Sequence, residues 1–170
     1  MPAIIHIALG SNRRHGTYGA PAAVVAAAIA ALAAVGPVVA KSTIRTTPPL
    51  GPRQRRFANA VAAVATDAPL DVVLAELQAI ERGFGRRYGR RWGPRVLDLD
   101  IVAAGAIVTP RAWRTARAGL IVPHRGAARR RFVLDPLVEL ASDWRHPVLH
   151  LTARQLRARL RRPRSLEPSP

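Results

Sequence analysis

An α+β fold with a mostly antiparallel sheet is predicted by three features of the sequence. Short apolar runs alternate with longer segments of helical periodicity, glycine and proline mark the boundaries, and no repeat or linker divides the 170 residues. The order is strand, helix, strand, strand, helix, strand, which is the βαββαβ arrangement of a ferredoxin-like fold. We expect one domain over residues 1–161, with helices packed on the sheet and a C-terminal extension, and a disordered tail over 162–170.

The first half of the pattern begins with a short apolar strand, Ala3–Leu9, which ends at a turn over Gly10–Asn12. Pro21 suits the first position of a helix, and the alanine-rich segment Ala22–Val35 forms its body. The β-branched, half-polar segment Val38–Thr46 predicts a second strand.

The second half repeats this order. Phe57–Thr66 is an apolar strand, and Leu70 to about Gly83 has apolar residues at helical spacing. An extended segment from Val96 to about Ala103 closes the sheet. On the helix, we expect solvent exposure for the side chains of Glu76, Gln78, Glu81 and Arg82.

The C-terminal extension has weaker signals. Ile107–Val108 is a candidate hairpin partner, and Asp135–Leu140 has the pattern of a helical turn. Thr152 is a candidate cap for a basic helix over Ala153–Arg161.

Composition narrows the function classes. The net charge is +17, carried by arginines apart from Lys41, which raises a nucleic-acid partner as a hypothesis. Aromatic residues are only 5%, however, so a base-stacking surface would be poorly supplied. The lack of cysteine, of a basic signal sequence and of a long apolar run predicts a soluble cytoplasmic protein without a membrane partner.

Two aspartates stand out in the segment from Val96 to Val102, which is otherwise apolar. In an extended chain Asp98 and Asp100 point to the same face, while the leucines beside them point to the other. Neighbouring carboxylates repel each other unless a cation lies between them, and Mg²⁺ with substrate phosphates suits such a pair.

A basic, glycine-containing loop precedes this pair. Its arginines are typical phosphate ligands, so the combination favours a nucleoside-triphosphate site over a solvated edge strand. The arginines are Arg86, Arg87, Arg90, Arg91 and Arg95.

A second group of residues favours a flat heterocycle as substrate. The loop Thr47–Pro52 is rich in proline and therefore stiff. Asn59 is the only polar side chain between Phe57 and Ala65, and a buried amide needs hydrogen-bond partners. Phe57 lies on the same strand face as Asn59, which indicates an aromatic and amide site.

Together these segments resemble the 6-hydroxymethyl-7,8-dihydropterin pyrophosphokinase family of the folate pathway. The resemblance extends from Ala8 to Pro147 and is strongest in the signature around the aspartate pair. The stretches that carry it are Leu9–Asn12, Thr47–Pro52, Phe57–Ala60, Arg91–Asp100, Val122–His124, Arg130 with Phe132–Leu134, and Asp143–Pro147.

The resemblance implies transfer of a pyrophosphoryl group from ATP to the hydroxymethyl group of the dihydropterin, with release of AMP. It implies two Mg²⁺ ions at Asp98 and Asp100, and a catalytic set of Arg86, Arg95, Asp98 and Asp100. Contacts to ATP are expected from Arg86, Arg87, Arg95, His124 and Arg130. Contacts to the pterin are expected from Thr47, Pro48, Leu50, Phe57, Asn59, Trp92 and Phe132.

Some points stay open at this level. The second loop arginine at ATP is either Arg87 or Arg90, and Arg125 stands where the family has an aromatic residue or proline, so the adenine-side contact is unassigned. The acceptor of the hydroxyl proton is also unassigned. The rival hypotheses are a basic nucleic-acid-binding module and a catalytically silent relative, and the acidic pair argues against both. We expect a monomer that binds ATP and the pterin and no nucleic acid.

Overall fold

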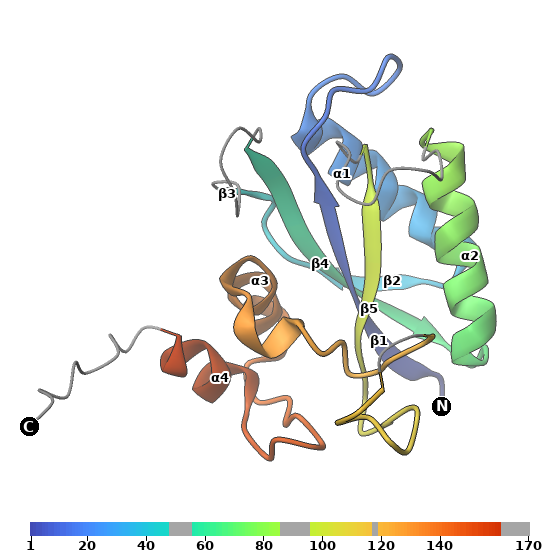
Figure 1. The fold of residues 1–170 in the computed structure, drawn as a ribbon. Helices are drawn as coiled ribbons and strands as arrows, with labels where there is room; N and C mark the ends of the chain where they lie inside the picture. Colours follow the sequence, from blue (N-terminus) through green and yellow to red (C-terminus); the bar gives the residue numbers. More distant parts are fainter. Residues whose placement is uncertain (48–55, 86–95, 117–118, 161–170) are drawn as a thin grey trace, which may run out of the picture.

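The computed structural model describes residues 1–47, 56–85, 96–116 and 119–160. Within these ranges the strands form one sheet in the order β2-β4-β1-β5, with β3 also paired to β4, and every pairing is antiparallel (Figure 1). The ferredoxin-like prediction is confirmed, and the predicted tail lies outside the described residues. The elements are β1 (Ala3–Ser11), α1 (Pro21–Ala31), η1 (Leu32–Ala34), β2 (Val38–Lys41), β3 (Arg45–Thr47), β4 (Phe57–Thr66), α2 (Leu70–Gly83), β5 (Asp98–Ala104), η2 (Ala127–Arg129), α3 (Arg131–Ala141) and α4 (Ala153–Arg159).

Helices cover both faces of the sheet (Figure 1). The side chains of Ile5, Ile7 and Leu9 on β1 form one core with α1 and α2. On the opposite face, Val61 and Val102 form a second core with α3 and α4. Because strand side chains alternate, the residues of β1 between the isoleucines face α3 and α4.

The central position of β4 in the sheet explains why the sequence of this strand is almost wholly apolar. It pairs with β1 on one side and with β2 and β3 on the other, and all its residues after Phe57 are buried. A strand that is covered on both faces has no solvent side, so it shows a continuous apolar run instead of alternation.

The predicted strand Val38–Thr46 is wrong as one unit, because it is divided into β2 and β3. At the break, Ser42 N–H donates to the Val61 carbonyl (2.9 Å), and Ser42 Oγ accepts from Val61 N–H (3.0 Å). The serine hydroxyl therefore replaces a backbone acceptor. The next residue, Thr43, donates its N–H and its hydroxyl to Glu139 on α3 (2.8 Å each), which turns the chain out of the sheet.

Three other boundaries differ from the prediction. β1 continues through Gly10 and Ser11, which pair with Asn59 and Ala58 instead of forming a turn. The C-terminal helical turn is a longer helix, α3, with Pro136 in its interior and Leu134 and Leu137 buried. The expected partner strand over 107–108 is replaced by a single bridge between Thr109 and Val122.

The last helix begins where the sequence predicts. Thr152 Oγ accepts from Gln155 N–H (3.2 Å), and Gln155 Oε1 accepts from Thr152 N–H (2.9 Å). This reciprocal pair satisfies two backbone donors at the start of α4. Across the described ranges, none of the helices has the length and apolar character needed to cross a membrane.

Candidate active site

The sheet register brings the predicted amide and the predicted acidic pair together. Gly10 on β1 is opposite Asn59 on β4 and opposite Asp98 on β5, so the three residues form one row across the sheet. In the next row, Ala8 on β1 is opposite Val61 and Asp100. Both rows face α3 and α4, because they alternate with the residues of the α1 and α2 core.

Small residues between these polar groups leave room on the sheet. A Cβ at Gly10 would lie 3.2 Å from Asn59 Oδ1, closer than ordinary contact. The strand prediction missed this role, since a glycine before Ser-Asn is more typical of a turn. Gly10 therefore leaves the surface of the sheet open between the Asn59 amide and Asp98.

Three of the residues that are predicted to contact the pterin, namely Thr47, Phe57 and Asn59, lie together on β3 and β4. Asn59 is buried, and its Nδ2 donates to Thr47 Oγ1 at 2.7 Å. Thr47 is also the register partner of Phe57, whose ring is half-buried. With Nδ2 engaged, Asn59 Oδ1 lies over Gly10 as a hydrogen-bond acceptor.

Asp98 and Asp100 are half-buried and flank Leu99, whose side chain points into the core on the other side of β5. The Leu99 N–H donates to Glu81 Oε1 on α2 at 2.8 Å. Because β5 is the edge strand of the sheet, this bond satisfies a donor that no neighbouring strand accepts.

The predicted solvent exposure of Glu81 is wrong, because this residue is only 2% exposed. Its position four residues after Leu77 places it on the buried face of α2, where it reaches the edge of β5. That spacing was the available signal in the sequence. A carboxylate favours solvent by its residue type, but the spacing of Glu81 is that of a core residue.

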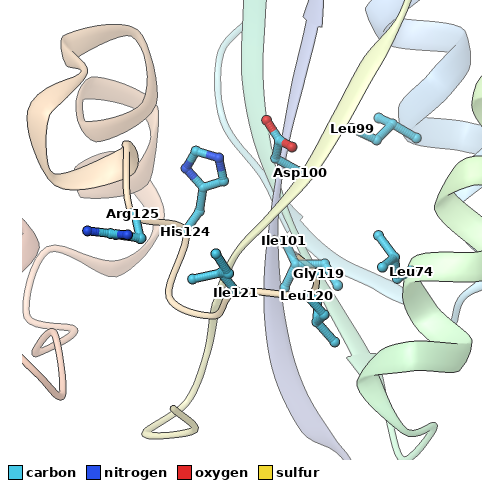
Figure 2. A pocket seen from close by; sticks show the side chains of 9 residues that line it. All are labelled: Leu74, Leu99, Asp100, Ile101, Gly119, Leu120, Ile121, His124 and Arg125. Carbon is cyan, nitrogen blue, oxygen red and sulfur yellow. The ribbon is translucent and has the colours of Figure 1, made fainter. Parts of the chain in front are cut away.

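The 122–126 turn, which begins at Val122, lies beside β5. His124 N–H donates to the Val102 carbonyl (3.0 Å), and Gly126 N–H donates to His124 Nδ1 (3.1 Å). With Nδ1 accepting, the neutral imidazole carries its proton on Nε2. The Asp100 carboxylate and the His124 ring point into the same opening (Figure 2).

Arg130 reaches this turn from the N-terminal end of α3. A Cβ at Gly126 would lie 2.9 Å from Cζ of Arg130 and 3.0 Å from Cε1 of His124. The guanidinium and the imidazole therefore lie near each other, beside the position that a Cβ of residue 126 would take. The same guanidinium lies 5.8 Å from the ring centroid of Phe132, which is half-buried against the α3 and α4 core.

A pocket of about 250 Å³ adjoins Asp100 at the outer edge of β5. It lies between α2 and the segment 119–125, and its walls are mainly aliphatic (Figure 2). Arg125 belongs to its lining, but its side chain turns away from Asp100 and His124 (Figure 2). The lining residues are Leu74, Leu99, Asp100, Ile101, Gly119, Leu120, Ile121, His124 and Arg125.

Several predicted site residues lie outside the described ranges, so their assignment stays a prediction. These are Pro48, Leu50, Arg86, Arg87, Arg90, Trp92 and Arg95. Among the residues that are described, no three His, Cys, Asp or Glu side chains gather in a way that would hold a metal ion.

The chain is similar to known proteins over most of its length. A family model described as 7,8-dihydro-6-hydroxymethylpterin-pyrophosphokinase matches residues 6–142. A 2-amino-4-hydroxy-6-hydroxymethyldihydropteridine pyrophosphokinase from Pseudomonas aeruginosa is 43% identical over 149 residues, which covers 84% of this chain and 83% of the relative. A protein of the same name from Methylorubrum extorquens is 40% identical over 142 residues, covering 81% and 82% of the two chains.

A solved structure extends the likeness to the fold. The Plasmodium falciparum HPPK-DHPS structure with pteroate matches 94% of this chain with a TM-score of 0.69 and 14% sequence identity. This chain spans 42% of the length of that protein. At such low identity the match supports the arrangement of strands and helices only.

Proposed function

This chain belongs to the 7,8-dihydro-6-hydroxymethylpterin-pyrophosphokinase family, and we propose that the sheet face with Asn59, Asp98 and Asp100 is its active site. The chain is a pyrophosphokinase that transfers pyrophosphate from ATP to 6-hydroxymethyl-7,8-dihydropterin in folate biosynthesis. One observation carries the site assignment, namely the row Asn59, Gly10, Asp98 across three neighbouring strands.

The row gives a length scale for the acceptor substrate. Two strand spacings separate Asn59 from Asp98, a distance of about 10 Å. A pterin whose polar edge lies against Asn59 spans this gap and directs its hydroxymethyl group towards the aspartates. Asn59 Oδ1 accepts from a ring or amino N–H, and Thr47 holds the amide in that orientation.

Two aromatic side chains flank the pterin in this proposal. Phe57 lies two residues before Asn59 on β4 and therefore on the same face of the strand. Phe132 comes from α3, which packs over β4. A flat heterocycle between two rings gains stacking contacts and loses its water on both faces.

The nucleotide occupies the other half of the site. The aliphatic pocket beside Asp100 accepts the base, between Leu74 of α2 and Ile121 (Figure 2). The phosphates then pass Asp100 towards His124 and Arg130, whose imidazole Nε2–H and guanidinium are donors for phosphate oxygens. The Arg125 side chain is turned away from Asp100 and His124 (Figure 2), so we propose no phosphate contact for it.

Asp98 and Asp100 are proposed to hold two Mg²⁺ ions with the ATP phosphates. The fit is supported by two half-buried carboxylates on one strand face, opposite the small residues Gly10 and Ala8 of β1. Bound magnesium supplies charge neutralisation on the transferring phosphates.

Release of AMP means that the hydroxymethyl oxygen loses its proton and bonds to the β-phosphorus, while the bond from that phosphorus to the oxygen bridging to the α-phosphate breaks and AMP leaves with that oxygen. The protein side chains position the two substrates for this in-line step and offset negative charge, and no covalent intermediate is required. Asn59 and Phe57 orient the acceptor, and His124 and Arg130 bind the donor.

The proposal also covers the setting of the enzyme. The chain has no cysteine, which suits a reducing compartment, and we place it in the cytoplasm as a monomer. We propose no nucleic-acid partner, because the open sheet face carries two carboxylates and α3 and α4 pack on the rest of it. Tight RNA retention on a filter at moderate salt without Mg²⁺ would favour the rival module instead.

The direct test is to incubate the protein with ATP and hydroxymethyldihydropterin and to measure AMP. We expect AMP and pterin pyrophosphate in equal amounts with MgCl₂, and none when EDTA exceeds the metal. Equal AMP formation with EDTA would contradict the magnesium assignment. AMP formation without the pterin would indicate a contaminating hydrolase, so that reaction is the control.

A further inference from the structure

The 122–126 turn is supported by a neighbouring segment for which the sequence analysis predicts no role. The segment 109–116 runs alongside it and is tied to it at both ends. Thr109 and Val122 exchange two backbone hydrogen bonds of 2.9 Å. At the other end, the Arg125 guanidinium donates to the carbonyls of Arg114 (2.9 Å) and Ala116.

Trp113 lies at the centre of this contact. Its side chain is buried, and its indole Nε1–H donates to the Pro123 carbonyl at 2.6 Å. Its ring is edge-on to buried His146, with centroids 5.3 Å apart and planes at 76°. The Arg125 guanidinium lies over the same ring, 5.8 Å from the centroid. A large, fixed ring thus holds both the backbone of the turn and one of its side chains.

The bond to Pro123 acts on the residue directly before His124. His124 is also held from β5, through its N–H bond to the Val102 carbonyl. These two bonds hold the carbonyl and the N–H of one peptide unit, the one directly before the Cα from which the imidazole projects. A side chain whose backbone is fixed in this way binds a phosphate without first losing conformational freedom.

The contacts of Arg125 have a second effect. Its guanidinium belongs to the residue next to His124, and Figure 2 shows it turned away from Asp100. The carbonyls of 114 and 116 together with the Trp113 ring account for that orientation. The pocket beside Asp100 therefore keeps its aliphatic walls open for a base.

We propose that Trp113 is a positioning residue for ATP, acting through the Pro123 carbonyl and the Arg125 side chain on the 122–126 turn. This inference rests on the proposed role of His124 and Arg130 at the ATP phosphates. Trp113 touches neither substrate. It holds in position the residues that are proposed to contact ATP.

The test is Trp113→Phe, which removes the indole N–H and keeps an aromatic ring. Trp144→Phe is the matched control, because Trp144 also contacts His146 and also donates its Nε1–H to a carbonyl, that of Gly105 at 2.9 Å. We expect Trp113→Phe to raise the KM for ATP by roughly threefold to tenfold, the effect of one lost hydrogen bond. The KM for the pterin stays unchanged, and Trp144→Phe changes neither constant.

Two additions keep the result unambiguous. Arg125→Leu alters an exposed side chain and is expected to raise the KM for ATP without lowering the melting temperature, so it tests the same contact if Trp113→Phe folds poorly. In a double-mutant cycle, Trp113→Phe adds nothing further to the KM for ATP in a His124→Ala background.

The inference is overturned if Trp113→Phe and Arg125→Leu leave the KM for ATP unchanged. Equal rises in the KM for both substrates, matched by Trp144→Phe, would also overturn it and show a general effect on folding. If the wild-type protein forms no AMP at all, the proposed function itself has failed, and that outcome is distinct from either.

Discussion

Gly126→Ala separates stability from nucleotide binding, because the two effects have opposite signs. Gly126 has φ −79° and ψ −16°, an ordinary conformation that alanine adopts without strain. Replacing glycine at such a position lowers the entropy of the unfolded chain and stabilises a protein by about 0.4–1 kcal/mol. The glycine is therefore not required by its backbone geometry.

Space is the reason for the glycine. The added methyl group would lie 2.9 Å from Arg130 Nε and Cζ, whereas ordinary contact begins at 3.4 Å. The guanidinium must move by at least 3.4 − 2.9 = 0.5 Å, and His124 Cε1, at 3.0 Å, must move by almost as much. The ends of flexible side chains make such movements at little cost in folding free energy, but both groups are proposed phosphate ligands.

Displacement of a binding group by 1 Å can lower a rate about a hundredfold. For half that displacement at two ligands we expect kcat/KM for ATP to fall by roughly tenfold, which is about 1.4 kcal/mol of transition-state stabilisation. Steady-state assays of AMP release with varied MgATP measure this effect. Thermal melting of the same preparation measures stability.

Gly83→Ala is the matched control. Gly83 is exposed in the last turn of α2, and a Cβ there meets nothing within 4 Å. It should gain similar stability and keep full activity. Unchanged kcat/KM for ATP in Gly126→Ala would refute the reasoning, since the methyl group cannot be placed without moving Arg130. A large loss of stability would equally show that the local packing is tighter than described.

Three further predictions concern the rest of the molecule. Asp98→Ala or Asp100→Ala should reduce turnover by about a thousandfold or more with an unchanged circular dichroism spectrum, and magnesium-dependent activity in both variants would exclude them as metal ligands. Asn59→Ala should raise the KM for the pterin by roughly tenfold and that for ATP much less, whereas equal rises for the two substrates would contradict its role at the pterin edge. Burial lowers the pKa of His146 to about 4 from its ordinary value of 6.5, so the unfolded chain binds more protons between these values and stability is lost as the pH falls from 6.5 to 4. His146→Asn keeps an acceptor for the Val148 N–H and should reduce the pH dependence of the melting temperature over that window. The remaining dependence then comes from His6, whose pKa is also lowered by burial. An unaltered pH dependence would exclude His146 as its source.

Residue order and alternation allowed much of this fold to be predicted. β4 and α2 have the predicted boundaries, because a continuous apolar run and helical spacing are both strong local signals. The break between β2 and β3 was not predictable in the same way. It depends on Ser42 meeting Val61 and on Thr43 meeting Glu139, contacts between residues far apart in the sequence.

The site shows the same division. Alternation predicted that Asp98 and Asp100 share a face, but only the cross-strand register shows that Asn59 lies in the same row with Gly10 between them. At Glu81 the residue type predicts solvent exposure, whereas the side chain is buried and bonded to β5. The role of Trp113 has no signal in the sequence, since an isolated tryptophan in an irregular segment has no periodicity to interpret.

Glu81 also explains how an edge strand can carry the acidic pair. Two adjacent carboxylates repel each other, and an edge strand has only one neighbour to hold it in register. The bond from Leu99 N–H to Glu81 gives β5 a second attachment on its open side, at the residue between the two aspartates. Because Leu99 also fills the core on the α1 and α2 side, the strand is held from that face and from its open edge. Asp98 and Asp100 then project from the remaining face of a strand that is held in place, and such rigidity suits the in-line phosphoryl transfer proposed for this site.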